Sequence, residues 1–227
     1  MTIKRTTVLL TTVLLLLLCP LLLLAQAKQD ELTQLTDKVD KHYNNLHSMK
    51  SHFVEDYHGA GMTRSESGTL WLKKPGKMRW EYNEPRKKLF ISDGKTAWFY
   101  VPGEQQAREE PVSKLDDIRS PLRFLLGKTK LRKEFDELGI APNIKPENPG
   151  DIVLRGSPKG MEDRISLVVL EVTPEGRIDR IEIEEVGGAV TDFRFTDVSE
   201  NIPVAENLFH FSPPAGVEVV EGTDLGN

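Results

Sequence analysis

Cysteine is nearly absent: the 227-residue sequence holds one, Cys19. Residues 1–27 have the pattern of a secretory signal peptide, with two basic residues near the start, then an apolar run, then a small-x-small cleavage site that ends at Ala27. We expect cleavage after Ala27 and export of residues 28–227. The exported chain, residues 28–227, then has no cysteine, which excludes disulfides and leaves packing as the source of stability.

A long uninterrupted apolar run is also missing from this leader. Thr11, Thr12 and Pro20 interrupt it, and no basic stop-transfer cluster follows, so an uncleaved membrane anchor is disfavoured. A lipid-modified N-terminus is disfavoured as well, because Leu18 precedes Cys19 where lipid modification needs a small residue. Cleavage is the better interpretation of the leader.

An excess of positive charge is lacking too. The chain has 30 Lys plus Arg and 35 Asp plus Glu, and removal of Lys4 and Arg5 with the leader changes the formal charge from −5 to −7. This acidic balance argues against nucleic acid as a partner. We expect residues 28–227 to form one monomeric domain with a single core. The proline-rich residues 141–151 are interpreted as a loop within that domain.

Catalytic and metal-binding patterns are missing as well. The five histidines have no metal-ligand spacing, and no Gly-rich phosphate loop is present. In the segment 156–160, Ser157 is misplaced for a Gly-x-Ser-x-Gly nucleophile elbow, and Pro158 spoils the helix that must follow. Adjacent carboxylates such as Asp116 and Asp117 do not converge on one point. We therefore expect no enzyme, no metal site and no cofactor.

Residues 68–100 are rich in patterns typical of β-strands. Four short β-type runs are joined there by turn signals at residues 75–76, 83–86 and 93–94. All three tryptophans of the chain fall in this stretch. Aromatic residues packed this densely either fill a core or line a wide apolar cavity.

The second of these runs alternates most clearly. Met78, Trp80 and Tyr82 are separated by single charged residues, so we expect them to share one face of a strand. That face must be apolar and covered.

The remaining elements are predicted from periodicity. Apolar residues at three- and four-residue steps predict helices over residues 32–46 and 112–126 and a short third helix over residues 131–139. Further strands are predicted at residues 51–58, 105–111, 152–155, 166–173, 177–186 and 189–198.

Together, the predicted strands and helices indicate a mainly β (α+β) fold. About nine to eleven antiparallel strands must curl as their twist accumulates. Three helices cannot bury their apolar stripes alone and must lie against the sheet. We therefore expect a barrel or half-barrel with helices over its open mouth or concave face.

Several short patterns together resemble the family of periplasmic outer-membrane lipoprotein carriers, the LolA family. They are Gly-x-Leu-Trp-x-Lys-Lys-Pro at residues 68–75, Ser-Asp-Gly-Lys-Thr-x-Trp-Phe-Tyr at 92–100, Ser-Pro-Leu at 120–122 and Phe-x-Pro-Pro-x-Gly-Val at 211–217. Their order and spacing are specific, and they extend over nearly the whole exported chain. The resemblance implies an unclosed antiparallel β-barrel of about 11 strands, with a lid of about three helices over an apolar cavity.

In that family the cavity binds acylated lipoproteins, and no covalent chemistry takes place. The resemblance implies that the chain takes triacylated lipoproteins from an inner-membrane lipoprotein-releasing ABC transporter and passes them to an outer-membrane acceptor. Burial of an acyl chain of about sixteen carbons is worth near 12 kcal/mol at roughly 0.8 kcal/mol per CH₂. A soluble carrier therefore needs an apolar cavity, and a lid that competes with the ligand for it.

The resemblance implies that apolar positions of the meander and of the first two helices form the cavity and lid. They are Val39, Tyr43, Leu46, Trp71, Met78, Trp80, Tyr82, Phe90, Trp98, Tyr100, Leu122, Leu125 and Leu126. Where the family has an arginine that latches the closed lid, this chain has Lys74, which is also a candidate for partner docking. Lysine lacks the planar fork of donors, so we expect a weaker latch. Arg123 is a second departure, a cation within the lid helix.

Other interpretations stay open. The tryptophans can be ordinary core residues. The seven cations among residues 73–88 can be a solvated face, or can dock an acidic pad on the transporter or anionic headgroups. The same fold can serve a periplasmic lipid or glycolipid carrier or an envelope-lipid sensor, and a hydrolase of envelope lipids is a further class.

Overall fold

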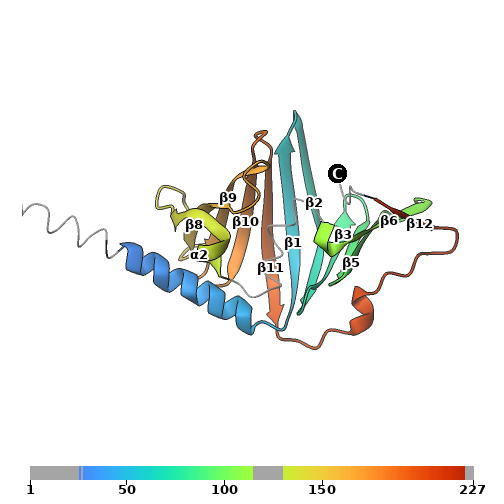
Figure 1. Cartoon of the computed structure of the whole chain (residues 1–227), viewed down its shortest axis with the longest axis horizontal. Coiled ribbons are helices and arrows are strands. Elements are labelled where there is room, and N and C mark those ends of the chain that lie inside the picture. The colour runs from blue at the N-terminus through green and yellow to red at the C-terminus, as the bar shows by residue number, and fades with distance from the viewer. Residues whose placement is uncertain (1–25, 27, 115–129, 223–227) are drawn as a thin grey trace, which may run out of the picture.

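A single sheet of twelve strands dominates the computed structural model, which describes residues 26, 28–114 and 130–222. The spatial order of the strands is β12-β6-β5-β4-β3-β2-β1-β11-β10-β9-β8-β7. Figure 1 shows the helices in front of one face of this sheet. The end strands β12 and β7 do not pair with each other in the described part of the chain, so the sheet is unclosed, as expected.

The sheet consists of two meanders, β1–β6 and β7–β11, with β12 added at one edge. In the sheet order, only the pairing of β1 with β11 joins the two meanders. Every pairing is antiparallel except that of β12 with β6, which is parallel. The strands are β1 (Ser48–Gly59), β2 (Met62–Lys73), β3 (Lys77–Glu84), β4 (Lys88–Asp93), β5 (Thr96–Tyr100), β6 (Gln106–Pro111), β7 (Phe135–Ile140), β8 (Ile152–Pro158), β9 (Ile165–Val172), β10 (Ile178–Glu185), β11 (Val190–Glu200) and β12 (Glu218–Glu221).

Strand β3 alternates as predicted. Met78, Trp80 and Tyr82 are buried, and the charged residues between them are half-exposed. The side of the sheet that carries these three residues is called the inner face below, and the opposite side the outer face. On the inner face, buried residues of both meanders and of the N-terminal helix form one apolar cluster.

The predicted first helix is confirmed over residues 28–45. Its apolar stripe, which includes Leu32 and Val39, is buried in the inner-face cluster. Tyr43 of the same stripe reaches β10, where its hydroxyl accepts a hydrogen bond of 3.0 Å from the backbone N–H of Ile178. Burial raises the pKa of the Tyr43 phenol, so the group stays neutral in this position.

The turn between β9 and β10 fits closely against this helix. Gly176 has a φ of +96°, and a Cβ at this position would lie 2.6 Å from the carbonyl carbon of Lys38. The Lys38 ammonium donates to the backbone oxygen of Pro174 in the same turn, at 2.8 Å. Any side chain at residue 176 would therefore strain the turn and push the helix away from the sheet.

The helices differ from the predicted set of three. The described residues contain two α-helices, residues 28–45 and α2 (Leu131–Glu134), and the 3-10 turns η1 (Val112–Lys114) and η3 (Glu206–Phe209). The third helix predicted over residues 131–139 is wrong beyond its first turn, because Phe135–Ile140 pairs with β8 as strand β7. Of the second predicted helix, Val112–Lys114 form the 3-10 turn η1, and residues 115–126 lie outside the described part of the chain. In the described ranges no helix is long and apolar enough to span a membrane.

Candidate functional site

Aromatic side chains gather around Trp80 on the inner face. The Trp80 side chain is 1% exposed. Its ring lies edge-on to those of Phe53 and Phe193, with centroid separations of 4.8 and 5.6 Å. The ring of Tyr82 is also edge-on to that of Phe53, with a centroid separation of 4.9 Å. Because these residues come from β1, β3 and β11, the aromatic group spans the seam between the two meanders.

Seven of the predicted cavity residues belong to the inner-face cluster. They are Val39, Tyr43, Leu46, Met78, Trp80, Tyr82 and Phe90. Much of the rest of the cluster comes from the second meander, which the sequence analysis did not single out: Leu154, Val168, Leu170, Ile181, Ile183 and Phe193. The alternation of buried Ile178, Ile181 and Ile183 with half-exposed residues in β10 is the signal that could have found this part of the face.

Trp71 lies on the outer face, which corrects its predicted place in the cavity. It is paired with Arg79 across β2 and β3. The cationic groups of Lys50 and Arg79 lie 5.8 and 6.0 Å from the centre of its ring. The physical reason is the alternation of β2, in which Leu70 and Leu72 occupy the inner positions.

Trp98 and Tyr100 are also on the outer face, in a second and smaller cluster with Ile91 and Phe211. The rings of Trp98 and Phe211 stack at 6.3 Å. Nε1 of Trp98 donates to a carboxylate oxygen of Glu109 at 3.0 Å. The predicted cavity position of Trp98 and Tyr100 is therefore corrected too: the C-terminal segment that carries Phe211 covers these side chains on the outside.

One end of the inner face is polar. Glu55 and Glu66 are buried there, at 6% and 5% exposure. The Tyr82 hydroxyl donates to Glu55 at 2.6 Å, the Lys88 ammonium to Glu66 at 2.6 Å, and Arg64 contacts Glu66 at 2.9 Å. Both carboxylates thus have charged or hydroxyl partners, and the cluster marks where the apolar surface ends.

Lys74 lies directly after β2 and holds the end of the N-terminal helix. Its ammonium donates to the backbone oxygen of Tyr43. Its backbone N–H donates to the backbone oxygen of His47 at 2.9 Å. Carbonyl groups at a helix C-terminus lack intrahelical partners, and a lysine there is favourable. Burial lowers the pKa of Lys74. Lys74 thus connects the end of β2 to the C-terminal end of the N-terminal helix.

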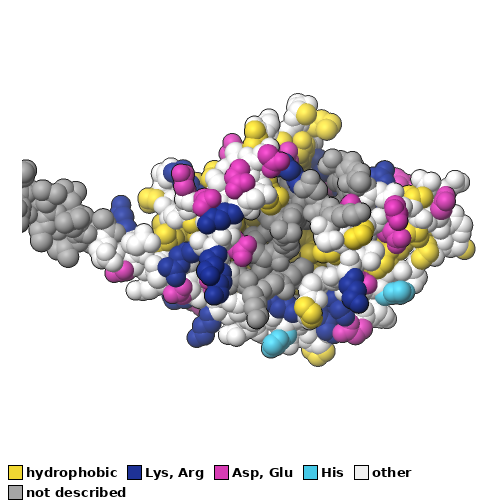
Figure 2. All heavy atoms as spheres, in the orientation of Figure 1, with side chains coloured by type: hydrophobic (Ala, Val, Ile, Leu, Met, Phe, Trp, Pro, Cys, Tyr) yellow, Lys and Arg dark blue, Asp and Glu magenta, His cyan; other side chains and the backbone are white. Residues whose placement is uncertain are grey.

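Part of the predicted lid, which includes Leu122, Arg123, Leu125 and Leu126, lies outside the described residues. The same is true of the predicted signal peptide apart from Gln26. On the face shown in Figure 2, Lys and Arg side chains gather over the N-terminal helix and α2, and hydrophobic side chains are visible toward β5. Within the described ranges, no three His, Asp or Glu side chains are placed to hold a metal ion.

The cationic run at residues 73–88 is largely paired within the molecule. The pairs are Lys73 and Lys77 with Glu206, Arg79 with Glu81, Arg86 with Glu104, and Lys88 with Glu66. Hydrogen bonds from Lys73 and Lys77 lower the pKa of Glu206 to about 2. These pairs favour a solvated, internally neutralised surface over an open cationic pad.

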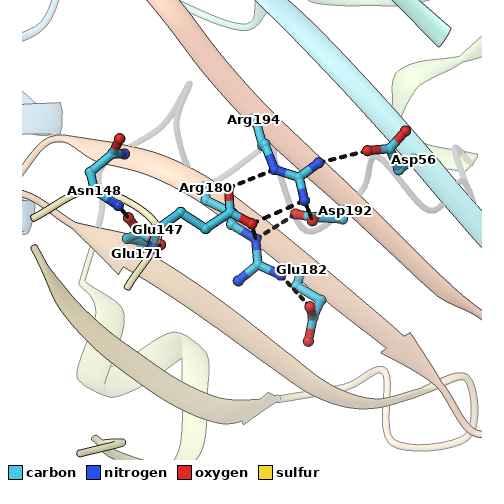
Figure 3. Close-up of polar contacts among 8 residues, drawn as sticks. All are labelled: Asp56, Glu147, Asn148, Glu171, Arg180, Glu182, Asp192 and Arg194. Atoms are coloured by element: carbon cyan, nitrogen blue, oxygen red, sulfur yellow. Dashed lines mark hydrogen bonds and ion pairs between the residues drawn. The ribbon is translucent and has the colours of Figure 1, made fainter. Parts of the chain in front are cut away.

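A network of ion pairs fastens the loop at residues 141–151 to the outer face (Figure 3). Arg194 contacts Glu147 at 2.7 Å, Asp56 at 2.6 Å and Asp192, and Arg180 contacts Asp192 at 2.8 Å, Glu147 at 3.5 Å and Glu182. The carboxylate of Glu171 accepts the backbone N–H groups of Glu147 and Asn148, at 2.9 and 2.7 Å. This side of β9–β11 is therefore occupied by the protein's own loop.

A separate open pocket of about 510 Å³ lies between the end of the N-terminal helix and the β9–β10 turn. Its lining is Lys38, Lys41, His42, Asn45, Leu46, Pro174, Glu175, Glu200 and Asn201. His42 and Glu200 are paired across it at 2.8 Å. Such a polar lining does not suit an apolar ligand, so the inner face is the stronger candidate site.

The sequence matches the model of a family described as outer membrane lipoprotein carrier protein LolA, over residues 44–212. A protein of Nitrosospira multiformis named outer-membrane lipoprotein carrier protein is 34% identical over 163 residues, which cover 70% of this chain and 74% of that protein. A protein of Bordetella avium with the same name is 31% identical over 207 residues, with 89% and 91% covered.

Among solved structures, the Mycobacterium tuberculosis lipoprotein LppX has a similar fold. The TM-score is 0.50 at 15% sequence identity, and the match covers 78% of this chain and 98% of LppX. At this identity the likeness concerns the fold alone.

Proposed function

The chain belongs to the LolA family of outer-membrane lipoprotein carrier proteins, and we propose that its inner face binds the acyl chains of lipoproteins. The observation that carries the proposal is the continuous apolar cluster centred on Trp80, to which both meanders and the N-terminal helix contribute. A surface of this kind binds long hydrocarbon chains and needs no catalytic group. The carrier performs no covalent chemistry.

The energetics suit a ligand that must be released again. An acyl chain of about sixteen carbons gains near 12 kcal/mol on complete burial. The inner-face residues are already buried against protein groups in this structure, so a ligand must displace those contacts. The net affinity is then far below the gross burial, and hand-over to a second protein becomes possible.

The proposed route runs from an inner-membrane lipoprotein-releasing ABC transporter to an outer-membrane acceptor. We place the protein in the periplasm as a monomer, after cleavage behind Ala27. Lys74 acts as a latch, because its hydrogen bond to Tyr43 ties the β2–β3 turn to the N-terminal helix that covers the inner face. Movement of that helix requires this contact to break.

Binding of a fluorescent triacylated lipopeptide tests the proposal, with the same peptide without acyl chains as the control. We expect the acylated peptide alone to form a water-soluble complex and to shift the emission of Trp80. Trp71→Ala is the matched variant on the outer face and should leave this binding unchanged. Absence of acyl-dependent binding would contradict the proposal. Native mass spectrometry that finds only a free lipid or glycolipid in protein from the host envelope would indicate a lipid carrier instead.

N-terminal sequencing of the protein from the periplasmic fraction tests the predicted export. The first residue found should be Lys28. Retention of Met1 in a membrane fraction would contradict cleavage.

A further inference from the structure

The inner face carries buried hydrogen-bond donors that no described residue uses. In the described part of the chain, four buried side-chain polar atoms have no hydrogen-bond partner: Ser51 Oγ, Trp80 Nε1, Asp151 Oδ2 and Thr191 Oγ1. Ser51, Trp80 and Thr191 are each 1% exposed. Three of the four atoms can donate a hydrogen bond, and all three belong to strands of the inner face.

Ser51 and Trp80 share one row across the sheet. Leu70 of β2 is paired with Ser51 of β1 on one side and with Trp80 of β3 on the other. Leu70 and Trp80 belong to the inner-face cluster, so Ser51, which is equally buried in the same row, faces the same side. Two strand spacings, about 10 Å, separate the backbones of Ser51 and Trp80.

Thr191 lies on the same face in β11. Phe193 and Phe195 of that strand are inner-face residues, and strand alternation gives Thr191 the same direction. Phe193 is in ring contact with Trp80. The three unused donors therefore border one aromatic surface that crosses β3, β1 and β11.

Three comparable donors elsewhere in the described part of the chain are paired. Nε1 of Trp98 donates to Glu109 at 3.0 Å. The buried Thr36 hydroxyl donates to the backbone oxygen of Leu32 at 2.9 Å, and that of Ser48 to the backbone oxygen of Ile202 at 2.6 Å. Because an unpaired buried donor destabilises the folded state, the exceptions on the inner face call for an explanation.

The chemistry of the donors defines the group that would satisfy them. An indole N–H only donates, so its partner must be an acceptor. Ser51 and Trp80 lie among apolar residues, so an ionised acceptor is excluded there, since a buried charge without a counter-charge is costly. Neutral acceptors that are attached directly to acyl chains are the carbonyl oxygens of esters and amides.

We propose that Ser51 and Trp80 donate hydrogen bonds to the acyl ester or amide carbonyls of the bound lipid, with Thr191 as a third donor along the same surface. This rests on the proposed function and deepens it. The inner face then recognises the linkage between acyl chains and headgroup, as well as the chains themselves. A lipid without these carbonyls leaves the donors unpaired and binds more weakly.

The test compares a diacylglyceryl-cysteine lipopeptide with its dialkyl-ether analogue of equal chain length. Ser51→Ala, Thr191→Val and Trp80→Phe each remove one donor and keep most of the side-chain shape. For wild type we expect the ester to bind more tightly than the ether. Ser51→Ala and Trp80→Phe should each lower the ester-to-ether affinity ratio by about fivefold to tenfold. Without ligand, the Ser51→Ala protein should unfold at the same temperature as the wild type or at a higher one. The same measurements with phosphatidylglycerol of equal chain length show whether the donors bind any diacylglyceryl lipid or the lipopeptide alone. A loss of affinity in the donor variants for either ester-linked ligand supports the proposal.

The matched control is Leu70→Val, which lies between the two donors and has no polar group. It should weaken the ester and the ether equally. If the donor variants also weaken both ligands equally, or leave the ratio unchanged because water satisfies these groups, the inference is overturned. If wild type binds neither ligand, the proposed function itself fails.

Discussion

The outer face of β10 and β11 pairs its charged side chains with one another, whereas the inner face of β1, β3 and β11 has buried donors without partners among the described residues. Two tryptophans show the contrast within one residue type. Nε1 of Trp98 on the outer face donates to Glu109, and Nε1 of Trp80 on the inner face has no partner among the described residues. The indole N–H on the outer face is thus satisfied within the protein, and the one on the inner face is left for a second molecule.

The two faces also differ in how firmly they are fixed. The network around Arg180 and Arg194 consists of directional contacts that hold a loop in one place. Apolar packing around Trp80 is not directional, so one set of apolar partners can replace another at little cost. The difference indicates that the outer face maintains the shape of the sheet while the inner face can exchange its contacts.

The largest expected effect separates two tryptophans of the two faces. Trp80→Ala should lower the free energy of unfolding by about 3–5 kcal/mol, because it opens a cavity in a buried aromatic cluster. Trp71→Ala should cost about 1 kcal/mol, since the ring is half-exposed and contacts mainly Lys50 and Arg79. Urea unfolding measures both values, and similar losses would remove the distinction between the faces.

A second variant breaks the outer network. Arg180→Met should lower the free energy of unfolding by about 2 kcal/mol, less than the roughly 3–5 kcal/mol typical of a lost buried partner, because Arg194 still pairs with Asp192. Asp192→Asn in the same background is the control and should recover part of the loss. Acyl-probe binding should not change. A loss of binding without a loss of stability would show that the outer face takes part in recognition.

The third prediction concerns Lys74, which connects the sheet to the helix over the inner face. Lys74→Leu should remove the latch and raise apparent affinity for an acylated ligand by about tenfold, with slower release to acceptor membranes. Lys74→Arg should strengthen the latch and lower the affinity. Loading and transfer of a labelled lipoprotein are the measurements. If Lys74→Leu loads and releases like wild type, apolar contacts alone hold the cover.

The smallest effect is expected at Glu206, which is exposed. Its pKa is lowered from an ordinary value near 4.5 to about 2 by Lys73 and Lys77. The stabilisation from this pairing is therefore present above pH 4.5 and is lost as the pH falls toward 2. Glu206→Gln should unfold at a slightly lower temperature than wild type at neutral pH, with the difference gone near pH 2. A difference that persists at pH 2 would point to a cause other than these ion pairs.

The sequence predicted the faces of β3 because polar and apolar residues alternate there. It could not assign Trp71, because Leu70 and Leu72 flank it and three consecutive apolar residues have no period. The same holds for Trp98 and Tyr100, which surround the inner residue Phe99. Only the register with neighbouring strands decides such positions, and register is not local information.

Strand β7 was missed for a related reason. Leu131, Phe135 and Leu138 have helical spacing, but β8 offers a free edge whose backbone groups pair with Phe135–Ile140. Tertiary pairing here overrides the local pattern. The alternation around Ile181 and Ile183 in β10 does predict a half-buried strand, but it does not say against which surface the buried side packs, so the contribution of the second meander to the inner face was missed.

The seam between the meanders has a consequence for folding. Asp56 of β1 and Arg194 of β11 meet there although 138 residues separate them in the chain. Such long-range pairing carries a high loop-closure entropy and forms late. Because β1 needs β11 as its second neighbour, the first meander cannot gain its full complement of hydrogen bonds until nearly all of the chain is available. A nascent chain that ends before β11 therefore lacks the pairing that joins the two meanders.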